Sequence, residues 1–489
     1  MNLSRLTLCF AFAASLLAGS VASADVSLPK IFGNGMVLQR GLATPVWGWA
    51  EPGEEVTVEF GDQKKTIKAD AKGAWSVKLD AQKEKSKGQS LKVSGKNTVS
   101  FEDVLLGDVW ICSGQSNMEW AVRNSMNPAE ELKAANYPNI RLFDVPGHTT
   151  SPTPKDKLPG GDWKKCAPDT VGSFSAVGYF FGRRLHKESK VPIGLIGTNW
   201  GGTRIEPWTP PVGFHQVPEL KAIADEVDKF DETTKVSGRT PTAIYQSMVH
   251  PLAPYGVRGA IWYQGESNGG EGESYFHKTQ ALIKGWRSVW GQGDFPLYFY
   301  FVQLADFQQP NDSPEGGNGW AKLREAQRKS LTIPHTGMAV ITDVGNATDI
   351  HPQNKQDVGS RLAQWALRDV YKKDVVPSGP LFKELKIEDG KARVLFNHAA
   401  DGLQIGMRKD GLKPTEFIED GKLARFAVAG KDKTWHWADA KIDGDSVVVW
   451  SKDVPEPVAV RYAYSMNPAG SNLYNSLGLP ASPFRSDDW

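Results

Sequence analysis

The sequence contains little cysteine and no long apolar run outside its N-terminus. Of its three cysteines Cys9 lies in the N-terminal segment, which leaves Cys112 and Cys166 for the rest of the chain. Two cysteines are too few for a disulfide-based scaffold, and Cys112 lies in an apolar run typical of a buried strand. After residue 24 no stretch of about 20 apolar residues occurs, so no insertion into a membrane is expected.

The sequence also has almost no net charge. Lysine and arginine number 57 and aspartate and glutamate 56, so no overall field favours nucleic acid or an acidic membrane, and a small or neutral partner is expected. An HExxH motif and a cysteine cluster are both absent. His351 and Asp349 alone make an incomplete zinc ligand set, so neither a metal nor another cofactor is expected.

The first 24 residues have the pattern of a secretory signal. Arg5 supplies the positive start, an apolar run extends from Leu6 to Ala18, and Ala22-Ser23-Ala24 forms a small-residue cleavage site. The pattern predicts export to the periplasm or the exterior of the cell. The sequence gives no indication of the oligomeric state.

The remainder divides into three predicted regions. Residues 25–105 alternate short β-rich runs with turns, which predicts a small β-sandwich domain. Residues 106–375 alternate strands and helices and are expected to form the catalytic domain, and residues 376–489 are again β-rich. The final stretch NLYNSLGLPASPFRSDDW is rich in turn residues and is predicted to be a tail laid over a folded surface.

The middle region indicates an α/β fold with a mostly parallel sheet. Five apolar runs are the predicted strands, namely 109–112, 192–198, 259–263, 297–304 and 337–342. Helices with apolar residues at a 3.6-residue period are predicted around 177–185, 275–289 and 358–370. Short buried strands that alternate with helices are typical of a parallel sheet covered on both faces.

Polar, specific segments follow four of the five predicted strands. They are SGQSNM, NWGGTRIEPW, QGESN and DVGNATDIHP. Reactive groups collect at the carboxyl ends of strands in such folds, and a serine becomes a nucleophile when a base takes its proton. Ser116 in the first segment is the candidate nucleophile and His351 in the last the candidate base, with Asp349 two residues before it as the acid. His250 is the other candidate for the base.

Ser116 alone does not decide between catalysis and helix capping. Met118 occupies the place where the Gly-x-Ser-x-Gly pattern requires glycine, so that pattern fails. Acyl transfer also needs N–H donors for an oxyanion, each worth about 3–4 kcal/mol of barrier. The candidate donors are the backbone of Gly201-Gly202, the side-chain amide of Gln264 and the N–H of Ser116. Each has a structural alternative, because paired glycines often form only a turn and Gln264 can instead hydrogen-bond a loop. Their joint occurrence at strand ends favours an esterase.

Four segments resemble those of the sialate O-acetylesterase group of the SGNH hydrolases, namely GQSNMEW, NWGGTRIEPW, GAIWYQGESN and DIHPQNK. The resemblance covers most of residues 32–489. It implies a flavodoxin-like SGNH domain, Ser116 as nucleophile and His351 as base. It also implies oxyanion donors from Ser116 and the Gly201-Gly202 pair, with Gln264 as the third. Some relatives use the glutamate of the QGE block to orient the histidine, so Glu266 remains an alternative to Asp349.

The predicted reaction is removal of an acetyl group from an O-acetylated sugar, like that of the sialate O-acetylesterases, through a Ser/His/acid triad and an acetyl-enzyme. Acetylxylan or xyloglucan esterase activity on the same fold is an alternative, and an inactive carbohydrate-binding protein is an alternative from another class. Arg204 is a candidate contact for sugar hydroxyls or a sialic carboxylate, with an exposed salt bridge as its alternative role. Gln246 stands where close relatives are expected to have asparagine, which is predicted to alter substrate contacts.

Overall fold

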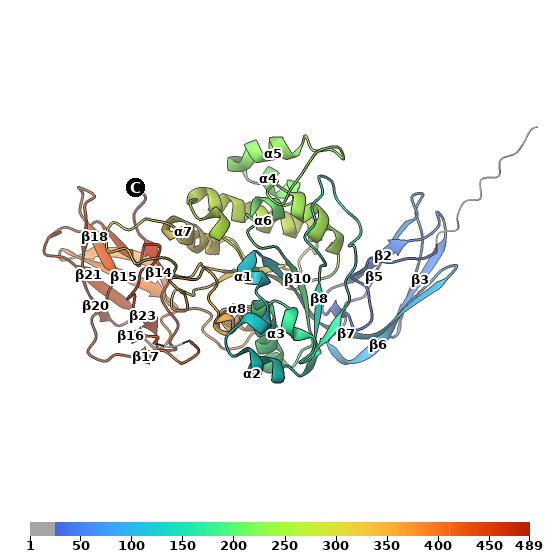
Figure 1. Cartoon of the computed structure of the whole chain (residues 1–489), viewed down its shortest axis with the longest axis horizontal. Coiled ribbons are helices and arrows are strands. Elements are labelled where there is room, and N and C mark those ends of the chain that lie inside the picture. Colours follow the sequence, from blue (N-terminus) through green and yellow to red (C-terminus); the bar gives the residue numbers. More distant parts are fainter. Residues whose placement is uncertain (1–24, 410) are drawn as a thin grey trace, which may run out of the picture.

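The computed structural model describes residues 25–409 and 411–489, and the predicted signal segment 1–24 lies outside these ranges. Three regions follow one another along the long axis of the molecule, with the N-terminal strands at one end and the C-terminal strands at the other (Figure 1). Among the described residues, no helix combines the length and the apolar character needed to cross a bilayer.

A mixed sheet with helices on both faces forms the centre. Its strand order is β13-β12-β11-β7-β10-β8-β9, with all neighbours parallel except β8 and β9. The strands are β7 (Thr98–Gly114), β8 (Tyr137–Asp144), β9 (Lys164–Cys166), β10 (Ile193–Asn199), β11 (Gly259–Tyr263), β12 (Tyr298–Val302) and β13 (Thr336–Ala339). The five predicted strands are all present, and β8 and β9 complete one edge.

Helices cover both faces of this sheet. The three predicted helices correspond to α3 (Ala176–Ser189), α6 (Glu273–Trp290) and α8 (Lys355–Asp369), to which the structure adds α7 (Ala321–Lys329). Figure 1 shows α3 and α8 below the sheet and α6 and α7 above it. Apolar stripes hold them there: the Phe181 ring of α3 packs on Trp110 of β7, and the Trp286 ring of α6 packs on Trp262 of β11. Shorter helices are α1 (Ser116–Glu119), α2 (Pro128–Lys133), α4 (Pro211–His215) and α5 (Lys221–Val227).

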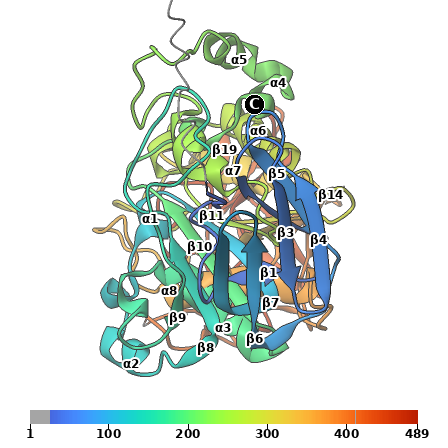
Figure 2. The ribbon, with the colours of Figure 1, turned by 90° about the vertical axis from the view of Figure 1, so that its right-hand side faces the viewer.

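The N-terminal region shares a strand with the central sheet. The first part of β7 pairs with β6 (Lys85–Ser94) and β1 (Val37–Gln39), and its last part pairs with β10 and β11. The predicted boundary between residues 105 and 106 therefore lies inside one continuous strand. The other N-terminal strands are β2 (Thr44–Trp49), β3 (Glu55–Phe60), β4 (Gln63–Lys68) and β5 (Ala74–Leu79). Figure 2 shows β3, β4 and β5 at the front.

The C-terminal region consists of several small antiparallel sheets. Its strands are β14 (Leu381–Glu388), β15 (Lys391–Asn397), β16 (Leu403–Met407), β17 (Glu416–Phe417), β18 (Phe426–Ala429), β19 (Trp435–Trp437), β20 (Asp439–Asp443), β21 (Ser446–Trp450), β22 (Ala459–Tyr462), β23 (Leu473–Asn475) and β24 (Phe484–Arg485). The prediction of a surface tail for the last stretch is wrong. Strands β23 and β24 pair with β16 and β22, because the buried side chains of Leu473 and Phe484 draw this segment into the core.

Candidate active site

Three strands of the central sheet end at the same level. Gly114, the last residue of β7, is paired in register with Asn199 of β10 and Tyr263 of β11. The segments that begin with Gln115, Trp200 and Gln264 therefore leave the sheet side by side. This places three of the four polar segments predicted from the sequence side by side at the carboxyl ends of their strands.

Ser116 begins helix α1 directly after a sharp turn. Gly114 has a φ of +143°, and a Cβ atom on it would lie 2.1 Å from the carbonyl oxygen of Tyr263, so only glycine fits there. The hydroxyl oxygen of Ser116 lies 2.9 Å from Nε2 of His351. The structure thus joins two side chains that are 235 positions apart in the sequence.

Asp349 and Trp120 hold the ring of His351. An oxygen of Asp349 accepts the backbone N–H of His351 at 2.8 Å and lies 3.5 Å from Nδ1. The indole of Trp120 stacks on the imidazole with the ring centres 5.0 Å apart. Partial burial lowers the pKa of His351, nearby Lys355 lowers it further, and Asp349 offsets part of the shift. The net lowering favours a neutral imidazole, which is the form that accepts a proton.

Glu266 is bound to Asn117, the residue after the serine. Among the described residues no contact joins Glu266 to His351. Oε1 of Glu266 accepts a hydrogen bond from the Asn117 side chain at 2.6 Å, and Asn117 also donates to the carbonyl of Ile350 at 3.0 Å. Burial raises the pKa of Glu266, and the hydrogen bond from Asn117 and the charge of Lys355 oppose the shift. Of the two acids considered, Asp349 is therefore the one beside the imidazole.

Asn117 and Lys355 were not assigned a role from the sequence. Lys355, at the start of α8, donates to the side-chain oxygen of Asn117. Its burial lowers the pKa to about 7, against the opposing charges of Glu266 and Asp349. Both residues lie within the quoted segments GQSNMEW and DIHPQNK, next to the predicted serine and histidine. Asn117 links the segment that bears Ser116 with the one that bears His351.

The predicted oxyanion donors have different surroundings. The N–H of Gly201 donates to a carboxylate oxygen of Glu119 at 2.7 Å, and a Cβ on Gly201 would lie 3.3 Å from that of Ser116, so this backbone passes close to the serine. The other oxygen of Glu119 lies 3.0 Å from Nε2 of His148. Gly202 has a φ of +72°, which favours glycine at this turn.

Gln264 and Gln246 are both buried. The Gln264 amide nitrogen has three acceptors within 3.2 Å, and its oxygen accepts from the Tyr275 hydroxyl at 2.8 Å. Gln264 therefore holds the loops together, as in the alternative role considered from the sequence. The Gln246 side chain is only 4% exposed, which places it within the protein.

Arg204 is engaged by carboxylates. It lies 3.1 Å from Glu206 and also pairs with Glu271. Lys278 joins the same cluster, 2.7 Å from Glu206 and 2.6 Å from Glu271. This ionic network fixes the loop after Gly201-Gly202 against the loop after β11, which corresponds to the salt-bridge alternative for Arg204.

Comparison with known proteins identifies the family of this chain. A family model described as carbohydrate esterase, sialic acid-specific acetylesterase, matches residues 106–368, which include both Ser116 and His351. The chain belongs to this family. The sialate O-acetylesterase of Mus musculus is 31% identical, over 92% of each protein, and that of Homo sapiens is 29% identical over 92% of this chain and 90% of the human protein.

A solved structure extends the family likeness to the whole molecule. The crystal structure of a carbohydrate acetylesterase from Xanthomonas citri is 40% identical, with a TM-score of 0.83, and the match covers 95% of this chain and 100% of that one. The two proteins thus share the N-terminal and C-terminal β regions in addition to the central sheet.

Proposed function

We propose that this member of the sialate O-acetylesterase family hydrolyses O-acetyl esters of sugars, with Ser116 as nucleophile and His351 as general base. The observation that carries the proposal is the 2.9 Å separation between the Ser116 hydroxyl and Nε2 of His351. This is hydrogen-bond distance, so the imidazole is within reach of the proton that it must remove.

The reaction proceeds in two halves. Ser116 Oγ attacks the acetyl carbonyl while His351 Nε2 takes the hydroxyl proton, and the C–O bond to the sugar then breaks as His351 returns that proton to the departing sugar oxygen. Water next attacks the acetyl-serine and gives a proton to His351. Collapse releases acetic acid and restores the serine hydroxyl with the proton from His351. Asp349 orients the imidazole and stabilises its charged form.

Backbone N–H groups stabilise the negative oxygen formed in each half. We assign this role to Ser116 and to Gly201, whose backbone passes beside the serine. In the structure Gly201 donates to Glu119, so the substrate carbonyl oxygen must displace that carboxylate. The Gln264 amide supports the loops from behind in this proposal, because its donors already have protein acceptors.

The sugar that carries the acetyl group is proposed to be uncharged. Arg204 is the residue considered for a sialic carboxylate, and it is already paired with Glu206 and Glu271. A third carboxylate would enter a cluster that already contains two. The family name therefore describes the relatives, while the site of this chain favours acetylated neutral glycans, such as those of the acetylxylan or xyloglucan type.

Two further proposals concern the fold and the location of the chain. The parallel strand order, with the candidate residues at the carboxyl ends of the strands, supports a flavodoxin-like SGNH domain between a β-sandwich and a C-terminal β-rich region. The N-terminal pattern of Arg5 and an apolar run supports export to the periplasm or beyond.

Replacement of the serine tests the catalytic proposal. Ser116→Ala is expected to lower turnover of 4-nitrophenyl acetate at least about 10⁴-fold while its melting temperature stays near that of wild type. Ser173→Ala, at an exposed serine, is the matched control and should keep full activity. Undiminished activity of pure Ser116→Ala protein would exclude Ser116 as the nucleophile. Glycan binding by wild type without acetate release would instead favour the inactive binding protein.

A substrate screen tests the proposed preference. Acetate release from O-acetylated xylan and xyloglucan fragments is expected to exceed release from O-acetylated sialic acids, measured at equal ester concentration. Faster release from the sialic acids would contradict the neutral-sugar proposal and leave the roles of Ser116 and His351 intact.

A further inference from the structure

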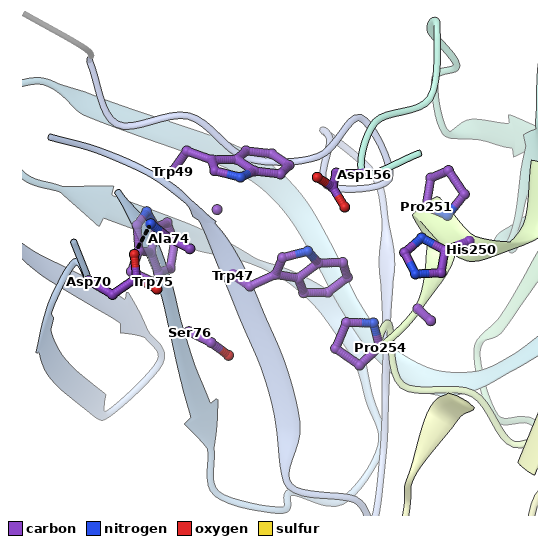
Figure 3. A pocket seen from close by; sticks show the side chains of 12 residues that line it. Trp47, Trp49, Asp70, Ala74, Trp75, Ser76, Asp156, His250, Pro251 and Pro254 are labelled. Atoms are coloured by element: carbon purple, nitrogen blue, oxygen red, sulfur yellow. Dashed lines mark hydrogen bonds between the residues drawn. The ribbon is translucent and has the colours of Figure 1, made fainter. Parts of the chain in front are cut away.

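A cavity of about 470 Å³ lies between the N-terminal strands and the central region, and the catalytic proposal does not use it. Its walls come from β2, β5, the loop that contains Asp156, and the segment 250–254 that precedes β11 (Figure 3). Ser116 and His351 are not among its lining residues. It is therefore separate from the candidate active site.

Two tryptophans of one strand project into this cavity. Trp47 and Trp49 are two positions apart on β2, so their side chains lie on the same face of the strand. Figure 3 shows both indoles extending toward Asp156 and His250 across the cavity. Their partners on β5 are Ser76 and Ala74, which are too small to cover an indole. Each ring therefore stays half-exposed toward the cavity.

Each of the two indoles has a neighbour that holds it, and the neighbour of Trp49 lies over one face of its ring. The Phe32 ring meets Trp47 edge-on, with the ring centres 4.9 Å apart, and the ammonium of Lys157 lies 4.3 Å from the centre of the Trp49 ring. Such contacts fix the orientation of a large ring before a ligand arrives, which lowers the entropic cost of binding.

Polar groups line the rest of the cavity. Asp70, Ser76 and Asp156 offer oxygen acceptors, and His250 lies opposite the tryptophans. His250 Nδ1 is 3.0 Å from the carbonyl oxygen of Lys155, so it carries the proton and Nε2 is an acceptor. Indole faces surrounded by hydrogen-bond acceptors suit a hydroxylated ring, whose C–H face packs on the aromatic ring while its hydroxyls donate.

The charges in the cavity decide between classes of ligand. Asp70 and Asp156 disfavour an acidic sugar, because a carboxylate on the ligand would meet two others. A cationic ligand would in turn compete with Lys157, which already lies over Trp49. The remaining class is an uncharged sugar.

One loop connects this cavity with the rim of the candidate active site. His148 stacks on Trp200 and pairs with Glu119 near the serine, and eight residues later Asp156 lines the cavity. The loop is fixed between these points, since the Lys155 N–H donates to the carbonyl of Gln246 at 2.8 Å. Eight residues span at most about 29 Å, so Asp156 lies no farther than this from His148, a distance that an oligosaccharide of several units covers.

We propose that this cavity is a second carbohydrate-binding site, which holds an uncharged sugar unit of the glycan against Trp47 and Trp49. The choice of a sugar rests on the proposed carbohydrate esterase function, but binding at this site requires neither Ser116 nor His351. The site would raise the affinity for polymeric substrates and leave small acetate esters unaffected.

Binding of sugars that carry no acetyl group tests the site separately from catalysis. Xylohexaose and cellohexaose are titrated into the full-length enzyme by calorimetry, with wild type, Trp49→Ala and the milder Trp49→Phe compared. Trp437→Ala is the matched control, because Trp437 is an exposed tryptophan of the C-terminal region. We expect saturable binding of at least one hexasaccharide by wild type and the control, weakened at least about tenfold in Trp49→Ala and less in Trp49→Phe.

Kinetics complete the test. In Trp49→Ala the KM for acetylated polysaccharide should rise while kcat/KM for 4-nitrophenyl acetate stays at the wild-type value. Absence of binding to wild type, or equal binding by Trp49→Ala and Trp437→Ala, would overturn the proposal, as would tighter binding of a uronic-acid oligosaccharide than of the neutral ones. Loss of 4-nitrophenyl acetate hydrolysis in Ser116→Ala is a separate result, so failure of either proposal is recognised independently.

Discussion

The backbone N–H of Gly201 donates a 2.7 Å hydrogen bond to the carboxylate of Glu119, three residues after Ser116. A single N–H cannot serve this carboxylate and a substrate oxyanion equally well, and a negative charge beside the oxyanion opposes its formation. Glu119 is therefore a competitor for the donor that the proposed mechanism needs.

The variant Glu119→Gln is expected to raise kcat/KM for 4-nitrophenyl acetate about fivefold. The amide keeps the size of the side chain and one acceptor oxygen but loses the charge, and a neutral hydrogen bond is weaker by about 1 kcal/mol. Glu130→Gln, at an exposed glutamate of α2, serves as the control in the same steady-state assay. A fall of tenfold or more would show instead that Glu119 is needed to position the turn at Gly201.

The pH profile should report the protonation of His351. Its pKa is lowered from the usual 6.5, first by partial burial and then by Lys355. Since the neutral ring is the base, kcat/KM should be constant at neutral pH and fall only as the pH drops through a value below 6.5. An acid limb centred above 6.5 in the profile for 4-nitrophenyl acetate would contradict this.

Removal of the charge of Lys355 should move the acid limb of the pH profile of kcat/KM to higher pH. A positive Lys355 disfavours a positive imidazole, so in Lys355→Met the pKa of His351 rises and the acid limb shifts to higher pH. Lys329→Met, an exposed lysine at the end of α7, is the matched control. The profiles of both variants would be measured with 4-nitrophenyl acetate, and an unchanged or lower limb in Lys355→Met would show that Lys355 does not act on His351.

The two candidate acids can be separated by parallel variants. Asp349→Asn should lower kcat by about 10²-fold or more, because it removes the carboxylate beside Nδ1 of His351. In Glu266→Gln kcat for the same substrate, 4-nitrophenyl acetate, should fall less than about tenfold, because Glu266 contacts Asn117 and not the imidazole. A larger loss of kcat in Glu266→Gln than in Asp349→Asn would reverse the two roles.

Much of this arrangement follows from the sequence alone. The apolar runs predict the strands, parallel strands bring their carboxyl ends to one edge, and Ser116 and His351 follow two such ends. The sequence does not show which acceptor each polar side chain uses. Gln264 looks free to donate to a substrate, but in the fold its amide meets Gln115, Thr203 and Asn268.

The fold was predicted less well where partners from distant segments decide the structure. The strand β8 begins with YPN and has an arginine at its centre, so its apolar pattern is weak, and Arg141 is accommodated because it donates to carbonyls of Pro138 and Gly35. The sequence places the domain boundary at residues 105 and 106, where short β-rich runs give way to alternating strands and helices, although β7 runs through this point. The pattern of elements changes there because the first part of β7 pairs with N-terminal strands and its last part pairs with strands of the central sheet. The strand itself continues without a break.

Asp108, near the middle of β7, provides a test of how the N-terminal region is joined to the central sheet. Its carboxylate is fully buried and lies 2.9 Å from Arg40, next to β1, and 3.2 Å from Arg258, next to β11. Burial alone would raise the pKa of Asp108, but Arg258 and Arg40 more than offset this, so its pKa is lowered. The charged carboxylate therefore stabilises the folded chain.

The variant Asp108→Asn should lower the free energy of unfolding by about 3 kcal/mol, because two half-buried guanidinium groups lose the fully buried carboxylate between them. Since the folded pKa is depressed, the contribution of Asp108 is present above the unfolded pKa of about 3.9 and is lost as pH falls through the folded value. Urea unfolding at pH 7 should thus separate Asp108→Asn from wild type, and the gap should narrow only at strongly acidic pH. Asp80→Asn, at an exposed carboxylate 3.0 Å from Lys65, should cost less than about 1 kcal/mol. Equal effects of the two substitutions would mean that the Asp108 cluster does not hold the regions together.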